Sequence, residues 1–206
     1  VGRWLIPGRP RTLLVEFSKL YPRKDGILAG LWERHQVDSI SGGWDYVEPL
    51  LFGHACGMVI EKWLREMSCA RPLPPVAHFH EWMTSAGMLY LKDHAPEVGS
   101  VFTTHATMLG RAVSATGLPP EEGLLGRDPE DVAESMGVTA KHSLEGVAAR
   151  SADAFTTVSK LTAEEAAVFH RRMAAPILPN GIDLDVIDEI AGPVGRDEAR
   201  ARLEQL

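Results

Sequence analysis

Short runs of β-branched and aromatic residues alternate along the chain with longer segments whose apolar residues recur at helical spacing. The short runs predict strands, because Val, Ile, Thr and Phe favour the pleated conformation. Strands are expected at Thr12–Phe17, Val76–Phe79, Val101–Thr104, Ala154–Val158 and Ile177–Leu178. Helices are expected at Ile27–His35, Tyr46–Met67, Glu81–Asp93, Met108 to about Thr116, Lys141–Ala152, Thr162–Arg172 and Arg196–Leu206. The repeated order of strand and helix predicts an α/β fold, a Rossmann-like parallel sheet with helices on both faces.

Two segments rich in turn-forming residues separate these elements. Gly117–Asp131 contains Gly, Pro and acidic residues and is expected to be a loop, whereas Pro179-Asn180-Gly181 is expected to be a turn. We expect a partial Rossmann-like lobe over residues 1–182, followed by an interdomain linker and the start of a second lobe over residues 183–206. The chain begins without an initiator Met and stops inside a predicted helix, so we interpret it as a piece of a larger protein.

The composition narrows the class of protein. The chain has 206 residues, 45% of them hydrophobic, which is enough for one sizeable domain. Its formal net charge of −7 argues against general binding of nucleic acids or anionic membranes, because both need a cationic face. Only Cys56 and Cys69 are present, no apolar run has the length of a membrane span, and no signal peptide is recognisable. We therefore expect a soluble, cytoplasmic chain.

His105 stands directly after the predicted strand Val101–Thr104, and Arg111 lies on the helix that follows. Open α/β sheets bind their ligands at the carboxyl ends of their strands. A neutral imidazole there can donate to one group and accept from another, and a guanidinium suits phosphate oxygens. The alternative is that His105 is a hydrogen-bonded structural residue and Arg111 a solvated charge.

The segment His78-Phe79-His80-Glu81-Trp82 leaves a second strand with two imidazoles and a carboxylate. His-x-His places both rings on one face of a strand, which is compatible with a metal site, but no third ligand follows at a motif spacing. Glu81 and Trp82 also suit sugar recognition. In a purely structural interpretation, Glu81 complements a helix N-terminus and both histidines are packing residues.

Other motifs are structural or absent. Thr162 with Glu165 three positions later predicts a capping box at the start of a helix. The sequence contains no G-x-G-x-x-G, no P-loop and no G-x-S-x-G, so dinucleotide, kinase and serine-hydrolase functions have no positive support.

Five segments, taken together and in this order, resemble glycogen synthase of the animal and fungal type, glycosyltransferase family 3. They are GRWLI (Gly2–Ile6), HFHEW (His78–Trp82), FTTHATMLGR (Phe102–Arg111), SADAFTTVSKLTAEE (Ser151–Glu165) and ILPNGID (Ile177–Asp183). The resemblance implies two Rossmann-like lobes facing a cleft, the arrangement called GT-B, of which this chain would hold part of the N-terminal lobe. It also implies a hexosyltransferase that moves glucose, with retention, from a nucleotide-glucose donor to the non-reducing end of an α-1,4-glucan.

The resemblance further implies the partners. The donor would be UDP-glucose, with ADP-glucose as the alternative, and the acceptor would be glycogen or another α-glucan. No metal and no cofactor are expected, and a homo-oligomer would form through the second lobe. Since that lobe supplies the Arg, Lys and Glu residues that hold the donor diphosphate, we expect this piece alone to have no turnover.

The family's functional positions are carried over residue by residue. The cleft histidine falls on His105, as the catalytic position, and the donor-binding positions fall on Arg111 and Glu81. His80, Asn180 and Gly181 are candidates for the cleft or the hinge between lobes.

The chain also departs from the family pattern. Where the family has approximately YHRYCIE, this chain has Thr139–Glu145, in which only Glu145 is kept, so a histidine contact cannot be assigned to Ala140. Residues 117–134 also diverge, which leaves acceptor preference open. Two alternatives remain: another GT-B enzyme with a small acceptor, such as a relative of sucrose- or trehalose-phosphate synthase, and a glucan-binding lobe without catalysis.

Overall fold

The computed structural model describes residues 1–66, 73–117 and 126–184, together with 187, 195, 198, 200 and 201. Cys69, most of the predicted loop after Gly117, and most of the predicted terminal helix and second unit lie outside the described residues. The regular elements are β1 (Gly2–Arg3), β2 (Arg11–Thr12), η1 (Ser18–Arg23), α1 (Lys24–His35), α2 (Trp44–Glu66), β3 (Val76–His80), α3 (Trp82–His94), β4 (Gly99–Thr104), α4 (Met108–Ser114), α6 (Pro129–Ser135), α7 (Thr139–Ser151), β5 (Ala154–Thr157) and α8 (Lys160–Phe169).

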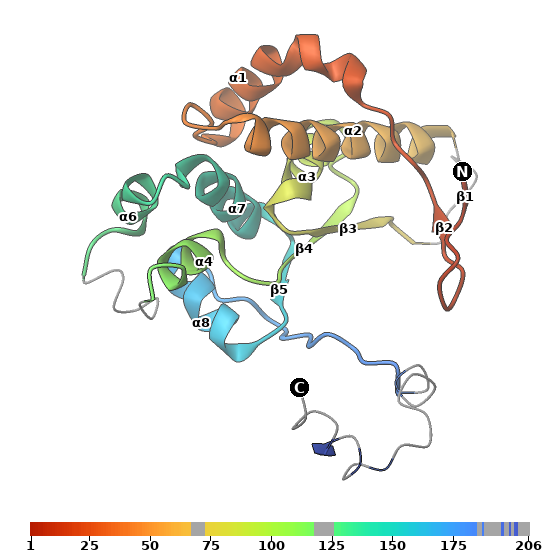
Figure 1. The fold of residues 1–206 in the computed structure, drawn as a ribbon. Coiled ribbons are helices and arrows are strands. Elements are labelled where there is room, and N and C mark those ends of the chain that lie inside the picture. The colour runs from red at the N-terminus through yellow and green to blue at the C-terminus, as the bar shows by residue number, and fades with distance from the viewer. Residues whose placement is uncertain are drawn as a thin grey trace.

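Strands β3, β4 and β5 form a parallel sheet in that order, with helices in the connections (Figure 1). The register pairs Phe79 with Phe102, and Phe102 with Phe155, so one buried phenylalanine from each strand meets across the sheet. The expected Rossmann-like α/β arrangement is therefore confirmed. Because the strands are parallel, their carboxyl ends, His80, Thr104 and Thr157, lie at one edge.

Helices α3 and α7 pack together against the sheet, and α2 covers α3, with α1 further out (Figure 1). Helices α2 and α3 approach closely through Gly53, Gly57 and Gly87. A Cβ atom at Gly57 would lie only 2.7 Å from the carbonyl oxygen of Gly87. These glycines bring two backbones closer than side chains allow, and we call this contact the α2–α3 glycine seam.

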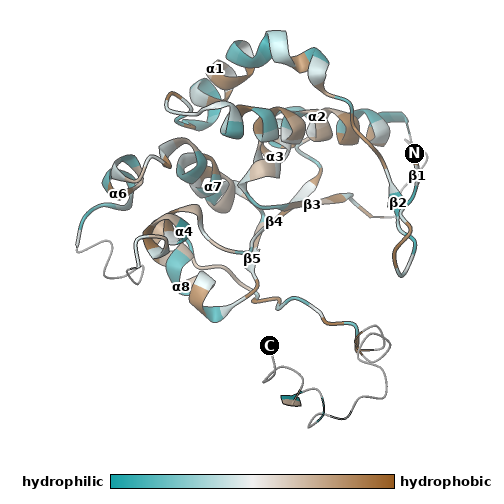
Figure 2. Ribbon diagram, viewed as in Figure 1, coloured by the Kyte–Doolittle hydropathy of each residue, from teal (hydrophilic) through white to brown (hydrophobic). Residues whose placement is uncertain are grey.

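Each major helix mixes hydrophobic and hydrophilic residues along its length (Figure 2). This is expected for helices with one buried face. The main core cluster extends from Leu31 on α1 through Leu50 on α2 and Leu89 on α3 to Leu144 on α7. No helix among the described residues has the length and apolarity that a membrane span needs.

The predicted strand Thr12–Phe17 is wrong beyond its first residue. Thr12 pairs in a short antiparallel hairpin, β1–β2, that is separate from the parallel sheet. Residues 13–17 have no partner strand, and Leu14 is 94% exposed. The sequence pattern identified β-branched residues but carried no information about a pairing partner.

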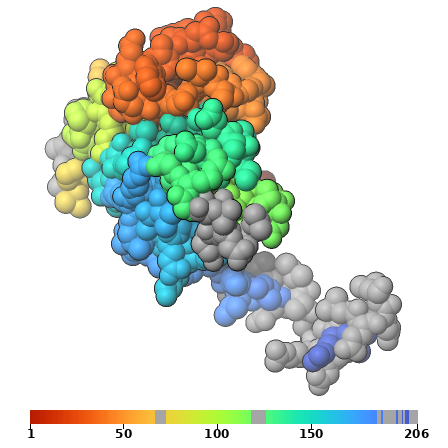
Figure 3. Space-filling view, turned by 90° about the vertical axis from the view of Figure 1, so that its left-hand side faces the viewer, coloured from red at the N-terminus to blue at the C-terminus, as the bar shows by residue number. Residues whose placement is uncertain are grey.

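The last predicted strand, Ile177–Leu178, is reduced to a single bridge between Ile177 and Thr157, with a 2.7 Å hydrogen bond from Leu178 N–H to Thr157 O. Both side chains are about half exposed, which leaves little apolar burial to extend the pairing. Asn180 and Gly181 follow in an exposed irregular segment, not in the predicted turn. The last described residues extend away from the body of the molecule (Figure 3).

The bounds of the helices also differ from the prediction, and α6 and α8 show the reason. Helix α6 begins inside the predicted loop, because Asp128 caps it by accepting from Glu130 N–H and Pro129 occupies its first turn. Helix α8 begins at Lys160 with Ser159 as its cap, so the capping box starting at Thr162 is wrong. The helix ends at Phe169 instead of Arg172, and His170 is fully buried.

Candidate functional site

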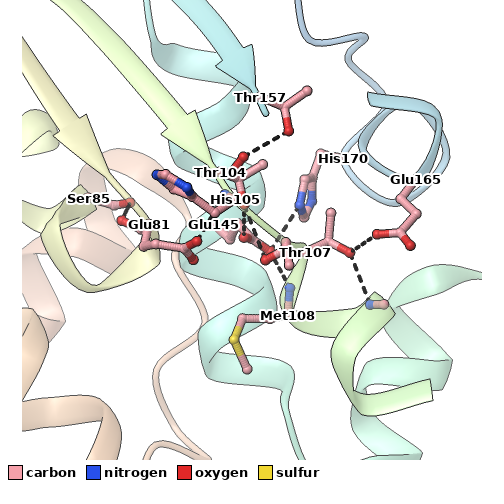
Figure 4. Close-up of polar contacts among 12 residues, drawn as sticks. Glu81, Ser85, Thr104, His105, Thr107, Met108, Glu145, Thr157, Glu165 and His170 are labelled. Carbon is pink, nitrogen blue, oxygen red and sulfur yellow. Dashed lines mark hydrogen bonds and ion pairs between the residues drawn. The ribbon is translucent and has the colours of Figure 1, made fainter. Parts of the chain in front are cut away.

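The site is built at the carboxyl edge of the sheet, where β3 leads into α3 and β4 leads into α4. The β4–α4 loop, residues Thr104–Met108, carries His105, and the β3–α3 junction carries Glu81 (Figure 4). The backbone N–H of His105 donates to Glu81 Oε1 at 2.9 Å. The sequence pattern placed each residue just after a predicted strand, and the structure brings the two residues into direct contact.

Glu81 has an unusual backbone. Its φ of 63° and ψ of 162° lie in a region that non-glycine residues rarely adopt, at a cost of about 1–3 kcal/mol. Its N–H donates to Thr103 O at 2.9 Å, and Thr84 N–H donates to its carbonyl at 3.2 Å, which together hold the conformation. The Glu81 side chain stands at the N-terminus of α3 but makes no capping hydrogen bond there, and it accepts from His105 N–H instead.

The electrostatics of Glu81 follow from this partly enclosed position. Burial raises the pKa of the Glu81 carboxyl, and the hydrogen bond from His105 N–H opposes that shift. Arg111 Nη2 lies 3.9 Å from Glu81 Oε1, and the arginine side chain is 59% exposed. An ion pair this long and exposed contributes little stability, which leaves the guanidinium available to a ligand at the sheet edge.

Three imidazoles line the same edge. His80 Nδ1 and His105 Nε2 are 3.1 Å apart, so one ring donates to the other, and the ring of His78 stacks on His80 with centroids 4.2 Å apart. His78 Nε2 contacts Thr103 Oγ1 at 2.7 Å. Partial burial, and then the neighbouring imidazoles, lower the pKa of both His78 and His80, which favours neutral rings. Among the described residues no group of three or more His, Cys, Asp or Glu side chains has a geometry that could hold a metal ion.

Sequence reasoning missed the side chains that hold the loop from below. Glu145 of α7 is fully buried and accepts from Thr104 Oγ1 and from Met108 N–H, both at 2.8 Å. Thr107 caps α4 by accepting from Gly110 N–H and donates to Glu165 Oε2 of α8 at 2.8 Å. Figure 4 shows three glutamates from three elements directed at one five-residue loop. One of these side chains could have been found from the sequence, because Glu145 is the one residue of Thr139–Glu145 that matches the family pattern.

The predicted site residues fall into two groups. His80, Glu81, His105 and Arg111 gather at the sheet edge. Asn180 and Gly181 are exposed, and none of the hydrogen bonds or ion pairs described for this chain joins them to that edge. The gathered groups offer neutral donors and acceptors for hydroxyls, one cation for a phosphate, and a carboxylate that orders the loop.

These features define a Rossmann-like partial α/β domain whose candidate ligand-binding groups stand at the carboxyl edge of its sheet. A family model described as glycogen synthase matches residues 1–191. The chain is 33% identical over 184 residues to a glycogen [starch] synthase of Neurospora crassa, covering 89% of this chain and 26% of that protein. It is 31% identical over 185 residues to glycogen [starch] synthase of Dictyostelium discoideum, covering 89% and 20%.

Isoform 2 of glycogen [starch] synthase from Saccharomyces cerevisiae is 31% identical over 184 residues, again covering 89% of this chain and 26% of the relative. The chain belongs to the glycogen synthase family. It spans a fifth to about a quarter of the length of these curated relatives.

Proposed function

We propose that this chain is part of the N-terminal lobe of a retaining, GT-B glycogen synthase. The complete protein would transfer glucose from a nucleotide-glucose donor, UDP-glucose in preference to ADP-glucose, to the non-reducing end of an α-1,4-glucan in the cytoplasm. The observation that carries the proposal is the position of His105 at the carboxyl edge of a parallel sheet, with its backbone held by Glu81. Family membership supports the same conclusion.

His105 would contact the donor glucose. A neutral imidazole can donate to a sugar hydroxyl without adding positive charge beside an oxocarbenium-like centre. The neighbouring His80 fixes one ring nitrogen of His105 by its 3.1 Å contact, so only the other nitrogen is left for a ligand. Arg111 would bind the donor phosphates, because its guanidinium is exposed at the same edge.

The chemistry would need groups beyond this chain. The departing nucleotide diphosphate requires several cationic partners, and Arg111 is the one arginine that the described contacts place at this edge. We assign those partners to a second lobe that closes over the cleft, with no metal or cofactor. The isolated 206-residue chain is therefore expected to transfer no glucose.

The test compares the complete protein with its His105→Ala variant, using radiolabelled UDP-glucose or ADP-glucose as donor and glycogen as acceptor. Loss of one transition-state hydrogen bond should lower kcat by about 10²- to 10³-fold while glycogen binding is retained. The matched control is His94→Ala, an exposed histidine on α3 whose Nδ1 contacts Tyr90 O, which should leave transfer unchanged.

Three outcomes would contradict the proposal. Unchanged transfer by His105→Ala would make His105 a packing residue. Transfer to sugar phosphates but not to glycogen would assign another GT-B activity, and glycogen binding without any transfer would assign a non-catalytic lobe. Clear turnover by the isolated chain would overturn the requirement for a second lobe.

A further inference from the structure

Glu145 lies directly beneath the β4–α4 loop and is fully buried, so its carboxylate is closed off from solvent and from any ligand dissolved there. We propose that Glu145 is a positioning residue that sets the place of His105 at the sheet edge, with His170 holding the Glu145 carboxylate in its orientation. The catalytic meaning of this assignment rests on the proposed function above. Its structural content, that the Glu145 carboxylate orders the loop around His105, does not.

The hydrogen bonds of Glu145 fasten both ends of the loop. Oε1 accepts from Thr104 Oγ1, the last residue of β4, and Oε2 accepts from the N–H of Met108, the first residue of α4, each at 2.8 Å. Between those two points, His105 N–H donates to Glu81 at 2.9 Å. The loop is thus held at three places within five residues, and its freedom to displace the imidazole is small.

His170 completes the arrangement. It is fully buried, and its Nε2 lies 3.1 Å from Glu145 Oε2, whereas its Nδ1 has no hydrogen-bond partner. A proton on Nδ1 would be an unpaired buried donor, which is costly, so the proton belongs on Nε2 and is donated to Glu145. The carboxylate then receives three hydrogen bonds from three separate elements: β4, α4 and the residue after α8.

Room for this imidazole is provided by Gly146, the neighbour of Glu145 on α7. A Cβ atom at Gly146 would lie 3.3 Å from His170 Nδ1, tighter than most side-chain contacts. The backbone of His170 is also held, since Arg150 Nη1 donates to its carbonyl at 3.4 Å. His170 is therefore fixed from both sides and can orient Glu145.

A merely structural role for Glu145 predicts a different response from a positioning role. Glu145→Ala leaves Met108 N–H and His170 Nε2–H without an acceptor, and the loop loses its lower support. In Glu145→Gln the amide oxygen can keep those two donors while the amide N–H donates to the Thr104 hydroxyl. The positioning role therefore predicts that Gln rescues what Ala loses.

The first experiment uses this chain alone and needs no catalysis. Amide hydrogen exchange should show Met108 and His105 losing protection by about tenfold or more in Glu145→Ala, because each lost hydrogen bond costs about one factor of ten. Glu145→Gln should retain most of the protection. The matched control is Glu61→Ala on α2, which removes the carboxylate that accepts from the Tyr90 hydroxyl. This change should leave the protection of the Met108 and His105 amides unchanged.

The second experiment uses the complete protein. Glu145→Ala should lower kcat by about tenfold to a hundredfold, because small displacements of a reacting group have effects of this size, with the KM for the donor changed less than about twofold. In a His105→Ala background, Glu145→Ala should cause no further loss, since it acts through His105. If Glu145→Ala does not fold, Thr104→Val replaces it, because that change removes one of the three donors at nearly constant volume.

Unchanged protection of Met108 and His105 in Glu145→Ala, or in Thr104→Val, would overturn the proposal. Equal losses of kcat in the presence and absence of His105 would also overturn it, because additivity indicates general structural damage. If the complete protein transfers no glucose at all, the proposed function fails, and the exchange result still decides whether Glu145 orders the loop.

Discussion

The α2–α3 glycine seam and the β4–α4 loop are both closely held, but by opposite means. In the seam, Gly53, Gly57 and Gly87 let two helix backbones touch, so the contact depends on shape alone. In the loop, buried carboxylates accept from backbone and hydroxyl donors, so the contact depends on hydrogen bonds and charge. The scaffold should therefore respond to added volume, and the site to changes in polarity that leave volume unchanged.

This difference matters for function. A packed seam defines where α3 lies, and hence where Glu81 stands, since Glu81 immediately precedes that helix. The loop needs finer control, because hydrogen bonds are directional and packing contacts are not. Substitutions in the two regions should therefore separate effects on stability from effects on activity.

The largest effect is expected in the seam. Gly87→Ala would bring a methyl group into the carbonyl oxygen of Gly53, a backbone atom that can move only with its helix. We expect a loss of at least about 3 kcal/mol in the free energy of unfolding, at the upper end of overpacking costs, measured by urea denaturation. The control is Gly26→Ala on α1, where a Cβ meets nothing within 4 Å, and which should be neutral or stabilising. Equal effects of the two changes would contradict the seam.

On the loop side of the molecule, a buried histidine should make stability depend on pH. Burial of His142 on α7, and then the nearby His170, lower the pKa of His142 from 6.5 to about 4. The unfolded chain binds this proton first, so the folded state loses about 2–3 kcal/mol of stability as pH falls from 7 to 4.

Urea denaturation at several pH values between 7 and 4 measures the slope of the free energy of unfolding against pH. His142→Gln should make that slope less steep, with His54 still contributing to it, whereas His94→Gln, a change at an exposed position, should leave it unchanged. An unchanged slope in His142→Gln would mean that this imidazole is protonated in the folded state.

Glu81→Gln should sharpen the comparison by affecting activity more than stability. The amide oxygen can still accept from His105 N–H, but the charge facing Arg111 is lost. We expect transfer by the complete protein to fall about tenfold, and the free energy of unfolding of this chain to change by less than about 1 kcal/mol, since burial already opposes that charge. A loss of several kcal/mol in stability without loss of transfer would place Glu81 with the scaffold.

The smallest effect is expected at Asn180. Its side chain is exposed and lies in an irregular segment, so Asn180→Ala should change the free energy of unfolding of this chain by less than about 0.5 kcal/mol. The same urea titration measures it. A clear loss of stability would show that the segment around Asn180 packs on the lobe.

The sequence by itself determined the parallel strands and their helices, with errors of one to three residues at most ends. Runs such as Val101–Thr104 carry a strong local preference, and that preference survives in the folded chain. The position of His105 followed from it, because the residue after a parallel strand must lie at the carboxyl edge. Local pattern also suggested Glu81 at the end of the neighbouring strand.

Only the tertiary structure decided what holds these residues in place. Glu145 is 41 positions from Thr104 and 25 from His170, and no local periodicity connects residues so far apart in sequence. The failed strand at Thr12–Phe17 has the same cause, since a strand exists only when a partner offers its hydrogen bonds. Secondary-structure propensity depends on residues that are near in sequence, whereas the tertiary structure determines which groups pair with buried donors and acceptors.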